Sequence, residues 1–255
     1  MSTVAIIMPA YRAQNTILSS IDSVINQTFK NWKLYIIIPS KDSLTENAVR
    51  PVIDKRHDIE LITQRAEHGE GVSVARNLGI MSSDSKYIAF LDADDMWLPE
   101  KLSKQVGMLE ENKLDFVGTN CIYFKNNRYY QYSLFFKKIT YTNLLVCNWI
   151  VLSSVLIRRD ILNEAPFYNL GHEDYFLWLC LLKNGRRAEV LNQSLTIYRV
   201  LPGSLSSNWL EIPEKMCKIY ALLRIPVILR GPLFVVYFLI TFFKKLCIYL
   251  RSTDA

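Results

Sequence analysis

Tyr87-Ile88-Ala89-Phe90-Leu91-Asp92-Ala93-Asp94-Asp95 is the stretch of this 255-residue chain that decides the fold. Five residues suited to a buried strand are followed at once by three carboxylates within four positions. Like charges this close repel one another unless a cation or solvent compensates them. Oxygen ligands at the end of a strand suit Mg²⁺ or Mn²⁺, above all when the ion also holds a substrate's phosphates. The simpler alternative is an acidic turn that caps a helix.

The chain on either side of this stretch alternates between strand and helix patterns. Apolar strands are expected at 4–8, 34–38 and 59–63, and helices near Thr16, at 72–80 and after Pro99. Strands this apolar, alternating with helices, predict an α/β fold whose mostly parallel sheet is covered on both faces. Ligands of such sheets bind beyond the carboxyl ends of the strands. The acidic cluster lies at one such end, and Pro9-Ala10-Tyr11 lies at another.

The second half is less regular and richer in aromatic residues. A buried helix is expected over 175–182, directly after Glu173-Asp174 and ending near Gly185. A loop is expected at 202–208. Strands are expected at 116–124, 129–136, 151–158 and 195–198.

The net charge of +6 comes entirely from the last 41 residues, which carry seven basic residues and one acidic residue. Residues 231–243 contain no charge, but a membrane-spanning helix needs about 20 apolar residues. Arg230, Lys244 and Arg251 fall on nearly one helical face, which predicts a helix lying in a membrane interface. The alternatives are a terminal helix packed on the domain's own core and a true membrane span. A basic charge confined to an apolar tail does not favour a nucleic-acid partner.

The five cysteines are scattered and never form a C-x-x-C pair, which predicts a reducing compartment without structural zinc. The apolar run at 4–8 is too short for the core of a secretory signal peptide, so a strand is expected there instead.

Six motifs occur in one order along residues 3–208, and together they resemble the inverting nucleotide-sugar glycosyltransferases of family two, of the bacterial surface-polysaccharide type. The motifs are Ile7-Met8-Pro9-Ala10-Tyr11, Ser23-Val24-Ile25-Asn26-Gln27-Thr28, Gly71-Val72-Ser73-Val74-Ala75-Arg76-Asn77-Leu78-Gly79-Ile80, Ala89 to Trp97 with Pro99-Glu100-Lys101-Leu102, His172-Glu173-Asp174-Tyr175, and Tyr198-Arg199 with Ser204 and Ser206. The resemblance implies a GT-A (Rossmann-like) domain over 1–210, with a nucleotide-binding half at about 1–115 and an acceptor half at about 116–210. A basic, apolar helical tail over 211–255 follows and is expected to associate with the membrane.

The resemblance also implies roles for individual residues. Asp94 and Asp95 are expected to hold Mn²⁺ or Mg²⁺, a Lewis acid that neutralises a diphosphate leaving group. Asp174 is expected to be the general base of an inverting displacement; its alternative is a helix N-cap. Donor contacts are expected from Pro9, Ala10, Tyr11, Asp42, Arg76, Asp92, Ala93 and Asp94. Weaker expectations for the acceptor side fall on Trp97, Trp149, His172 and Glu173.

Two segments depart from the family pattern. Pro39-Ser40 stand where the family carries an acidic pair that commonly recognises uracil, which weakens the case for a UDP-sugar donor. Residues 165–169 replace a typical Gly-Phe-Asp-Glu on the acceptor side.

The resulting prediction is a metal-dependent inverting glycosyltransferase at the cytoplasmic face of the cell membrane. It would move a sugar from a nucleotide-sugar to a saccharide acceptor, expected to be lipid-linked, in capsule, O-antigen or exopolysaccharide biosynthesis. The alternative, motivated by Pro39-Ser40, is a non-catalytic nucleotide- or glycan-binding subunit of a polysaccharide assembly complex. A nucleotidyltransferase or hydrolase is disfavoured because no Gly-rich phosphate loop is present.

Overall fold

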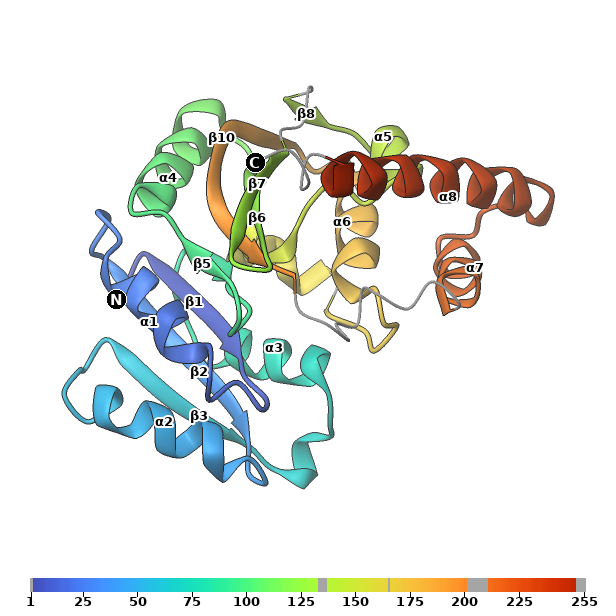
Figure 1. Ribbon diagram of the computed structural model, residues 1–255. Helices are drawn as coiled ribbons and strands as arrows, with labels where there is room; N and C mark the ends of the chain where they lie inside the picture. The colour runs from blue at the N-terminus through green and yellow to red at the C-terminus, as the bar shows by residue number, and fades with distance from the viewer. Residues whose placement is uncertain (1, 133–136, 165, 201–210, 251–255) are drawn as a thin grey trace.

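The computed structural model describes residues 2–132, 137–164, 166–200 and 211–250 (Figure 1). Ten strands form one sheet: β1 (Val4–Pro9), β2 (Trp32–Pro39), β3 (Ile59–Gln64), β4 (Tyr87–Phe90), β5 (Met96–Trp97), β6 (Phe116–Lys125), β7 (Arg128–Tyr132), β8 (Lys138–Ile139), β9 (Leu156–Arg158) and β10 (Ala188–Arg199). The α-helices are α1 (Ile17–Ile25), α2 (Ser43–Ile53), α3 (Val72–Met81), α4 (Lys101–Asn112), α5 (Tyr141–Leu145), α6 (Glu173–Lys183), α7 (Ile212–Leu222) and α8 (Val227–Leu250). Short 3₁₀ turns lie at η1 (Ala66–His68), η2 (Leu152–Ser154) and η3 (Arg159–Glu164).

The strand order is β3-β2-β1-β4-β9-β6-β10-β5, with β7 beside β6 and β8 beside β10. The first four strands pair in parallel, as the alternating pattern predicts, and β6 pairs in parallel with β10. β9 runs antiparallel between β4 and β6, so the sheet as a whole is mixed. The carboxyl ends of β1, β2 and β4 meet at one edge, since Ile7 of β1 is in register with Tyr35 of β2 and Phe90 of β4.

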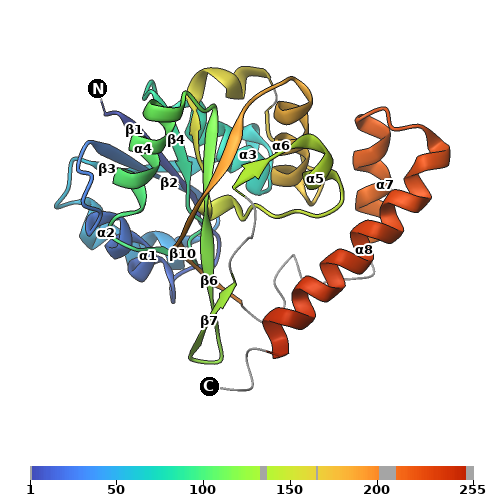
Figure 2. The same cartoon turned by 90° about the horizontal axis from the view of Figure 1, so that it is seen from above.

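Helices cover both faces of the sheet, and the buried side chains divide accordingly into two main clusters. α1, α2 and α4 pack on one face, while α3, α5, α6 and α7 pack on the other (Figures 1 and 2). α3 lies unusually close to the sheet at Gly79. A Cβ atom added there would stand 2.7 Å from Ile7 Cγ2 and 2.8 Å from Ile37 Cδ1.

The two helices of the tail have different surroundings. α7 buries Ile212, Met216, Ile219 and Tyr220 in the same cluster as α6. α8 extends along the outside of the body (Figure 2). It contains the one described segment that is long and apolar enough to cross a membrane, Val227–Lys244, with a mean hydropathy of 1.8. The predicted domain boundary at residue 210 falls among residues that are not described and stays a prediction.

The strands expected at 4–8, 34–38 and 59–63 and the helices expected near Thr16, at 72–80 and after Pro99 are present. The strand expected over 151–158 is wrong in its first half, because Leu152–Ser154 form a 3₁₀ turn before β9 begins. α2 was not anticipated, and α8 is longer than the uncharged run at 231–243. The loop expected at 202–208 and part of the strand expected at 129–136 lie outside the described residues.

Candidate active site

Arg76 lies at the centre of the site and joins its two halves. It projects from α3, and its side chain is only 6% exposed. One guanidinium nitrogen donates to Asp92 Oδ1 at 2.9 Å, and another donates to Glu173 Oε1 at 2.5 Å. The guanidinium also stands 5.5 Å from the centre of the Phe167 ring. A single buried cation therefore links the acidic cluster after β4 to the first turn of α6.

Asp174 follows Glu173 in the first turn of α6 and is partly buried. Burial, and then the neighbouring charge of Glu173, raise the pKa of Asp174 to about 6, while the charge of Arg76 opposes the rise. A carboxylate whose pKa lies near neutrality is suited to take up a proton in a catalytic step. Asp174 therefore has the charge environment of a general base, close to the acidic cluster.

Asp95 differs from its expected role as a metal ligand, because its carboxylate points into the protein. Asp95 is 1% exposed; its Oδ2 accepts from the Ser153 hydroxyl at 2.5 Å and its Oδ1 from the Arg199 backbone N–H at 2.9 Å. Burial, with the charges of Asp94 and Asp92, holds the pKa of Asp95 well above its usual value. Asp95 anchors the acidic loop, and the case for direct metal ligation moves to its neighbour.

Asp94 has the features of a cation ligand. It is partly exposed, and no other side chain in the described ranges hydrogen-bonds to its carboxylate. Burial and the charge of Asp92 raise the pKa of Asp94 to about 6, so a bound cation would relieve a real electrostatic cost. The described residues hold no cluster of three or more His, Cys, Asp or Glu side chains arranged around a metal. Such a site fits an ion like Mg²⁺, which uses one or two carboxylates together with substrate phosphates.

Two residues that hold the acidic loop were not among the predicted site residues. Ser153 also accepts from the Asp92 backbone N–H at 3.1 Å, and its carbonyl accepts from Trp97 Nε1 at 2.7 Å. Arg199, at the end of β10, donates from Nε to the Asp94 carbonyl at 2.8 Å. The Tyr198-Arg199 motif pointed to this position, whereas nothing in the residues around Ser153 did.

The loop after β1, where donor contacts are expected, is organised by Asp42. Both oxygens of this buried carboxylate accept from backbone N–H groups, Oδ2 from Arg12 at 2.5 Å and Oδ1 from Thr45 at 3.2 Å. Burial favours a higher pKa, but these hydrogen bonds outweigh it and hold the pKa of Asp42 below its usual value. The contacts fix Arg12 at a φ of 53° and cap α2, while Tyr11 is left 52% exposed. Pro9, Ala10 and Ala93 are buried, so their backbone is what the site can use.

The four residues expected on the acceptor side separate in the structure. Trp97 is 3% exposed beneath the acidic loop, with the Lys101 ammonium 4.0 Å from its ring centre, so it does not line a binding surface. Trp149 is partly buried, and its indole donates to the Asn143 carbonyl at 2.9 Å. His172 is the N-cap residue of α6, and Glu173 is the partner of Arg76.

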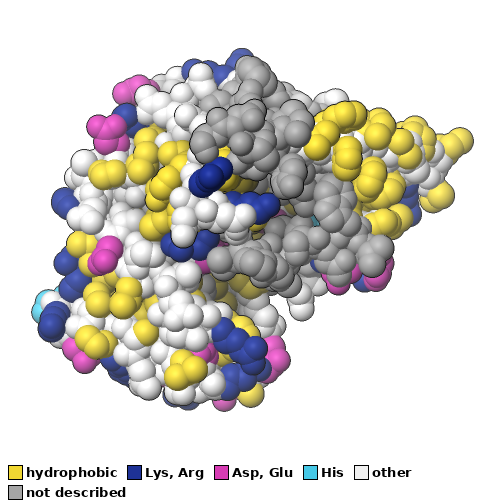
Figure 3. Space-filling view, in the orientation of Figure 1, with side chains coloured by type: hydrophobic (Ala, Val, Ile, Leu, Met, Phe, Trp, Pro, Cys, Tyr) yellow, Lys and Arg dark blue, Asp and Glu magenta, His cyan; other side chains and the backbone are white. Residues whose placement is uncertain are grey.

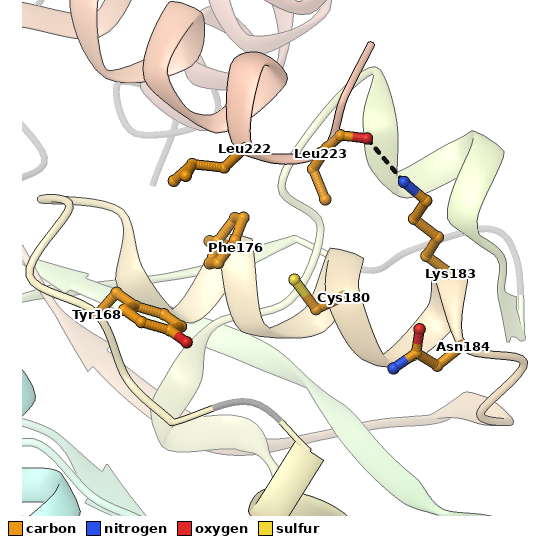
Figure 4. Close-up of a pocket in the computed structure, with 7 residues that line it drawn as sticks. All are labelled: Tyr168, Phe176, Cys180, Lys183, Asn184, Leu222 and Leu223. Carbon is orange, nitrogen blue, oxygen red and sulfur yellow. Dashed lines mark hydrogen bonds between the residues drawn. The ribbon is translucent and has the colours of Figure 1, made fainter.

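A cavity of about 350 Å³ lies between α6 and α7, away from the carboxylates (Figure 4). Tyr168, Phe176, Cys180, Leu222 and Leu223 line it, and Lys183 Nζ closes one side by donating to the Leu223 carbonyl at 2.7 Å. Its edge is the segment around Tyr168, whose carbonyl accepts from the Ser73 hydroxyl of α3 at 3.2 Å. The cavity and the carboxylate cluster therefore share one supporting segment.

Comparison with known proteins identifies the family of this chain. The model of the family described as "Glycosyl transferase family 2" matches residues 5–164. The chain is 35% identical, over 80% of its own length and 80% of the relative, to the Escherichia coli UDP-Glc:alpha-D-GlcNAc-diphosphoundecaprenol beta-1,3-glucosyltransferase WfgD. It is 28% identical to the putative teichuronic acid biosynthesis glycosyltransferase TuaG of Bacillus subtilis, over 85% of this chain and 86% of that one.

Solved structures show the same fold. Staphylococcus aureus TarS, in complex with UDP-GlcNAc, superposes with a TM-score of 0.68 at 19% identity, covering 87% of this chain and 66% of that chain. The mannosyltransferase PcManGT from Pyrobaculum calidifontis, in complex with GDP-Man and Mn²⁺, gives 0.66 at 16% identity, covering 86% and 63%. The fold is GT-A, and since the family model matches well over half of its residues, the chain belongs to glycosyl transferase family 2.

Proposed function

We propose that this chain is a metal-dependent, inverting glycosyltransferase that moves a sugar from a nucleotide-sugar to a lipid-linked saccharide. The observation that carries the proposal is the bridge made by Arg76. It holds Asp92 of the acidic loop and Glu173, the neighbour of Asp174, on one guanidinium group. The carboxylate suited to a metal and the carboxylate suited to a base therefore belong to a single site.

On the donor side, Asp94 would hold Mn²⁺ or Mg²⁺, and a bound ion of this kind neutralises the charge that develops on a diphosphate leaving group. Ser153 and Arg199 hold the loop in place through Asp95. The Asp94 carboxylate is therefore already in position when the metal ion binds, and no ordering of the loop is needed at that step. Arg76 is already paired with two carboxylates. Its contribution is the positioning of Asp92 and α6 more than the direct binding of phosphate.

On the acceptor side, Asp174 would take the proton of the acceptor's hydroxyl group while the oxygen of that hydroxyl bonds to the anomeric carbon. The bond from that carbon to the diphosphate breaks on the opposite face, and the nucleoside diphosphate leaves. One base and one direct displacement invert the anomeric configuration. No covalent intermediate is required.

The substrate classes follow from the relatives. WfgD takes UDP-Glc and a diphosphoundecaprenol-linked sugar by its name, and we propose the same classes here, a UDP-sugar and a polyprenyl-diphosphate saccharide of a surface polysaccharide. Pro39 and Ser40 offer no carboxylate to the base, so we propose that backbone groups of this loop and the exposed face of Tyr11 recognise it. Because a lipid-linked acceptor lies in a membrane, we propose that the enzyme works at the membrane surface, on its cytoplasmic side.

The proposal is tested with a panel of nucleotide-sugars, Mn²⁺ or Mg²⁺, and polyprenyl-diphosphate saccharides. The Asp174→Asn variant should lose on the order of 10²–10⁴-fold in transfer, because a general base contributes about that much. Its affinity for the donor nucleotide, measured by calorimetry, should stay within about threefold of the native value, since binding does not use the base. Asp84→Asn is the matched control, because this exposed carboxylate precedes the amino end of β4, whereas the acidic cluster of the site follows the carboxyl end of the same strand. Native rates in Asp174→Asn would remove Asp174 from the mechanism.

A further inference from the structure

The outer face of α8 is apolar without interruption. Every exposed residue between positions 227 and 243 is aliphatic or aromatic, or is Gly231 or Pro232. The exposed side chains include Ile228 at 82%, Val227 at 75% and Phe243 at 58%. At 3.6 residues per turn they occupy about half of the circumference of the helix. Figure 3 shows the apolar side chains gathered over α8, on the arm that extends from the body. The full set is Val227, Ile228, Leu229, Val235, Val236, Phe238, Leu239, Phe242 and Phe243.

The two charged residues of α8 whose side chains the structure describes, Arg230 and Lys244, lie against the protein instead. Lys244 Nζ donates to the Asn148 carbonyl at 2.9 Å and stands 5.3 Å from the centre of the Trp149 ring. Arg230 Nε donates to the Ile225 carbonyl at 3.0 Å. Arg230 and Lys244 do share a side of the helix, as the sequence predicts, but that side is the inner one. Within the described part of α8, these two cations therefore do not form an exposed rim beside the apolar face.

The composition of the outer face decides what covers it. Protein interfaces combine Tyr, Trp and Arg anchors with a rim of hydrogen-bonding groups. Among the exposed residues between 227 and 243 no side chain can donate or accept a hydrogen bond. Such a surface is suited to contact with lipid hydrocarbon, which forms no hydrogen bonds. Large exposed apolar patches on folded proteins mark sites of contact with a partner or a membrane.

We infer that α8 lies in the plane of a lipid bilayer with its outer face inserted among the acyl chains, and that this attachment is hydrophobic, without dependence on anionic lipid. The helix does not span the bilayer in this arrangement, because several residues of its inner face contact the body. Tyr237 is buried against Tyr175, with ring centres 5.7 Å apart, and Thr241 lies beside Cys147. A spanning helix would have to release these contacts.

The test is flotation of the full chain with vesicles, without donor or acceptor, so that its result is independent of the proposed catalysis. Binding to pure phosphatidylcholine should match binding to vesicles containing phosphatidylglycerol within about threefold. It should also persist from about 0.1 M to 0.5 M NaCl, where screening would weaken an electrostatic contact. The double variant Val236→Glu/Leu239→Glu should lose about tenfold or more, because charges in the acyl region are costly. Leu44→Glu, a change at an apolar residue of α2 that is 65% exposed, is the matched control and should bind normally.

Three results would overturn the inference. The first is binding only to anionic vesicles with loss at high salt. The second is absence of vesicle binding together with a dimer in sedimentation that the double variant dissociates, since the outer face would then be covered by a second copy. The third concerns orientation. A cleavable tag placed after Ala255 should stay accessible to added protease on bound vesicles, and its protection would show that α8 crosses the bilayer.

Discussion

At the scale of single residues, Asp94 and Asp95 are neighbours in sequence with opposite surroundings. Asp95 is 1% exposed and held by Ser153 and the Arg199 backbone, whereas Asp94 is partly exposed. We expect Asp94→Asn to weaken Mn²⁺-dependent binding of UDP by about 10–100-fold, as loss of a ligand or its support commonly does. Asp95→Asn should keep that binding within a few-fold and instead lower the free energy of unfolding by about 1–3 kcal/mol, because a buried acceptor pair is disturbed. Calorimetry and urea unfolding of both variants check that Asp94 serves metal binding and Asp95 serves stability. Equal losses of metal-dependent binding in the two variants would contradict this assignment.

The pKa of Asp174 predicts the pH dependence of transfer. A general base must be ionised, and burial with the charge of Glu173 raises the pKa of Asp174 to about 6. Transfer should therefore rise as the pH passes upward through about 6. Glu173→Gln removes the charge that raises this pKa and leaves Arg76 to lower it further, so the inflection should move to lower pH.

Asp94 supplies the internal control for that profile, because its pKa is also about 6. Burial and the charge of Asp92 raise the pKa of Asp94, and Glu173 is not among the causes. An inflection that stays in place in Glu173→Gln would mean that Asp94, and not Asp174, controls the pH dependence.

Sequence motifs located these carboxylates but could not orient them. Asp94 and Asp95 are equal candidates for the metal in the sequence. Their difference arises from Ser153, some 60 positions away, whose hydroxyl reaches Asp95 in the fold, where β9 lies beside β4. Trp97 was expected to contact an acceptor because it follows the acidic cluster. β5 pairs with β10 instead, and this pairing turns the indole inward.

At the scale of elements, local patterns were sufficient where a strand or helix carries its own signal. β1, β2, β3 and α3 have clear apolar periodicity, and the structure confirms them. α2 contains Pro51 and two buried residues in its 11, so its signal is weak. It depends on the cap that Asp42 supplies, and that cap also serves the loop at Arg12. β9 has only three residues, and its antiparallel place between β4 and β6 depends on pairing with strands distant in the chain. Its local sequence therefore could not predict where it lies in the sheet.

Gly79 is the position where α3 depends most on close packing. A methyl group there would stand 2.7 Å from Ile7 Cγ2, so Gly79→Ala should lower the free energy of unfolding by about 1–3 kcal/mol despite the better helix propensity of Ala. Arg76 lies one turn earlier on α3, and its displacement should also slow transfer. Gly107→Ala on α4 is the matched control, because its Cβ would meet only Glu111 Oε1 at 3.9 Å and should stabilise by about 0.5–1 kcal/mol. Equal stability of the two variants in urea would contradict the tight packing of α3.

At the scale of the whole molecule, α8 has two faces with separable roles. Its inner face reaches the site through one aromatic pair, since Tyr237 packs on Tyr175, the residue after Asp174. The Tyr175 hydroxyl in turn donates to the Leu144 carbonyl at 2.9 Å and holds α5 against α6. Its outer face is the proposed membrane contact. The net charge of the tail, which suggested an electrostatic attachment, says little about either role because two of its cations are engaged with protein carbonyls.

This separation gives a prediction about the molecule as a unit. Tyr237→Ala removes a ring that is 5% exposed, and it should lower the free energy of unfolding by about 3–5 kcal/mol. Because the first turn of α6 loses its support, transfer should also fall, by about 10–100-fold for a small displacement of the base. Tyr237→Phe keeps the ring and should retain most of the activity. Vesicle binding should be normal in both, because the outer face is unchanged.

The outer-face variant should give the opposite pattern. Val236→Glu/Leu239→Glu should transfer sugar to a water-soluble acceptor at the native rate and fail only on vesicle-bound acceptor, because both side chains lie on the exposed outer face of α8. Rates on the two acceptors, measured side by side for both sets of variants, separate the roles. A Tyr237→Ala enzyme that is as active as Tyr237→Phe would show that α8 does not support the site. An outer-face variant that is slow on the soluble acceptor would show that the two faces of α8 act together.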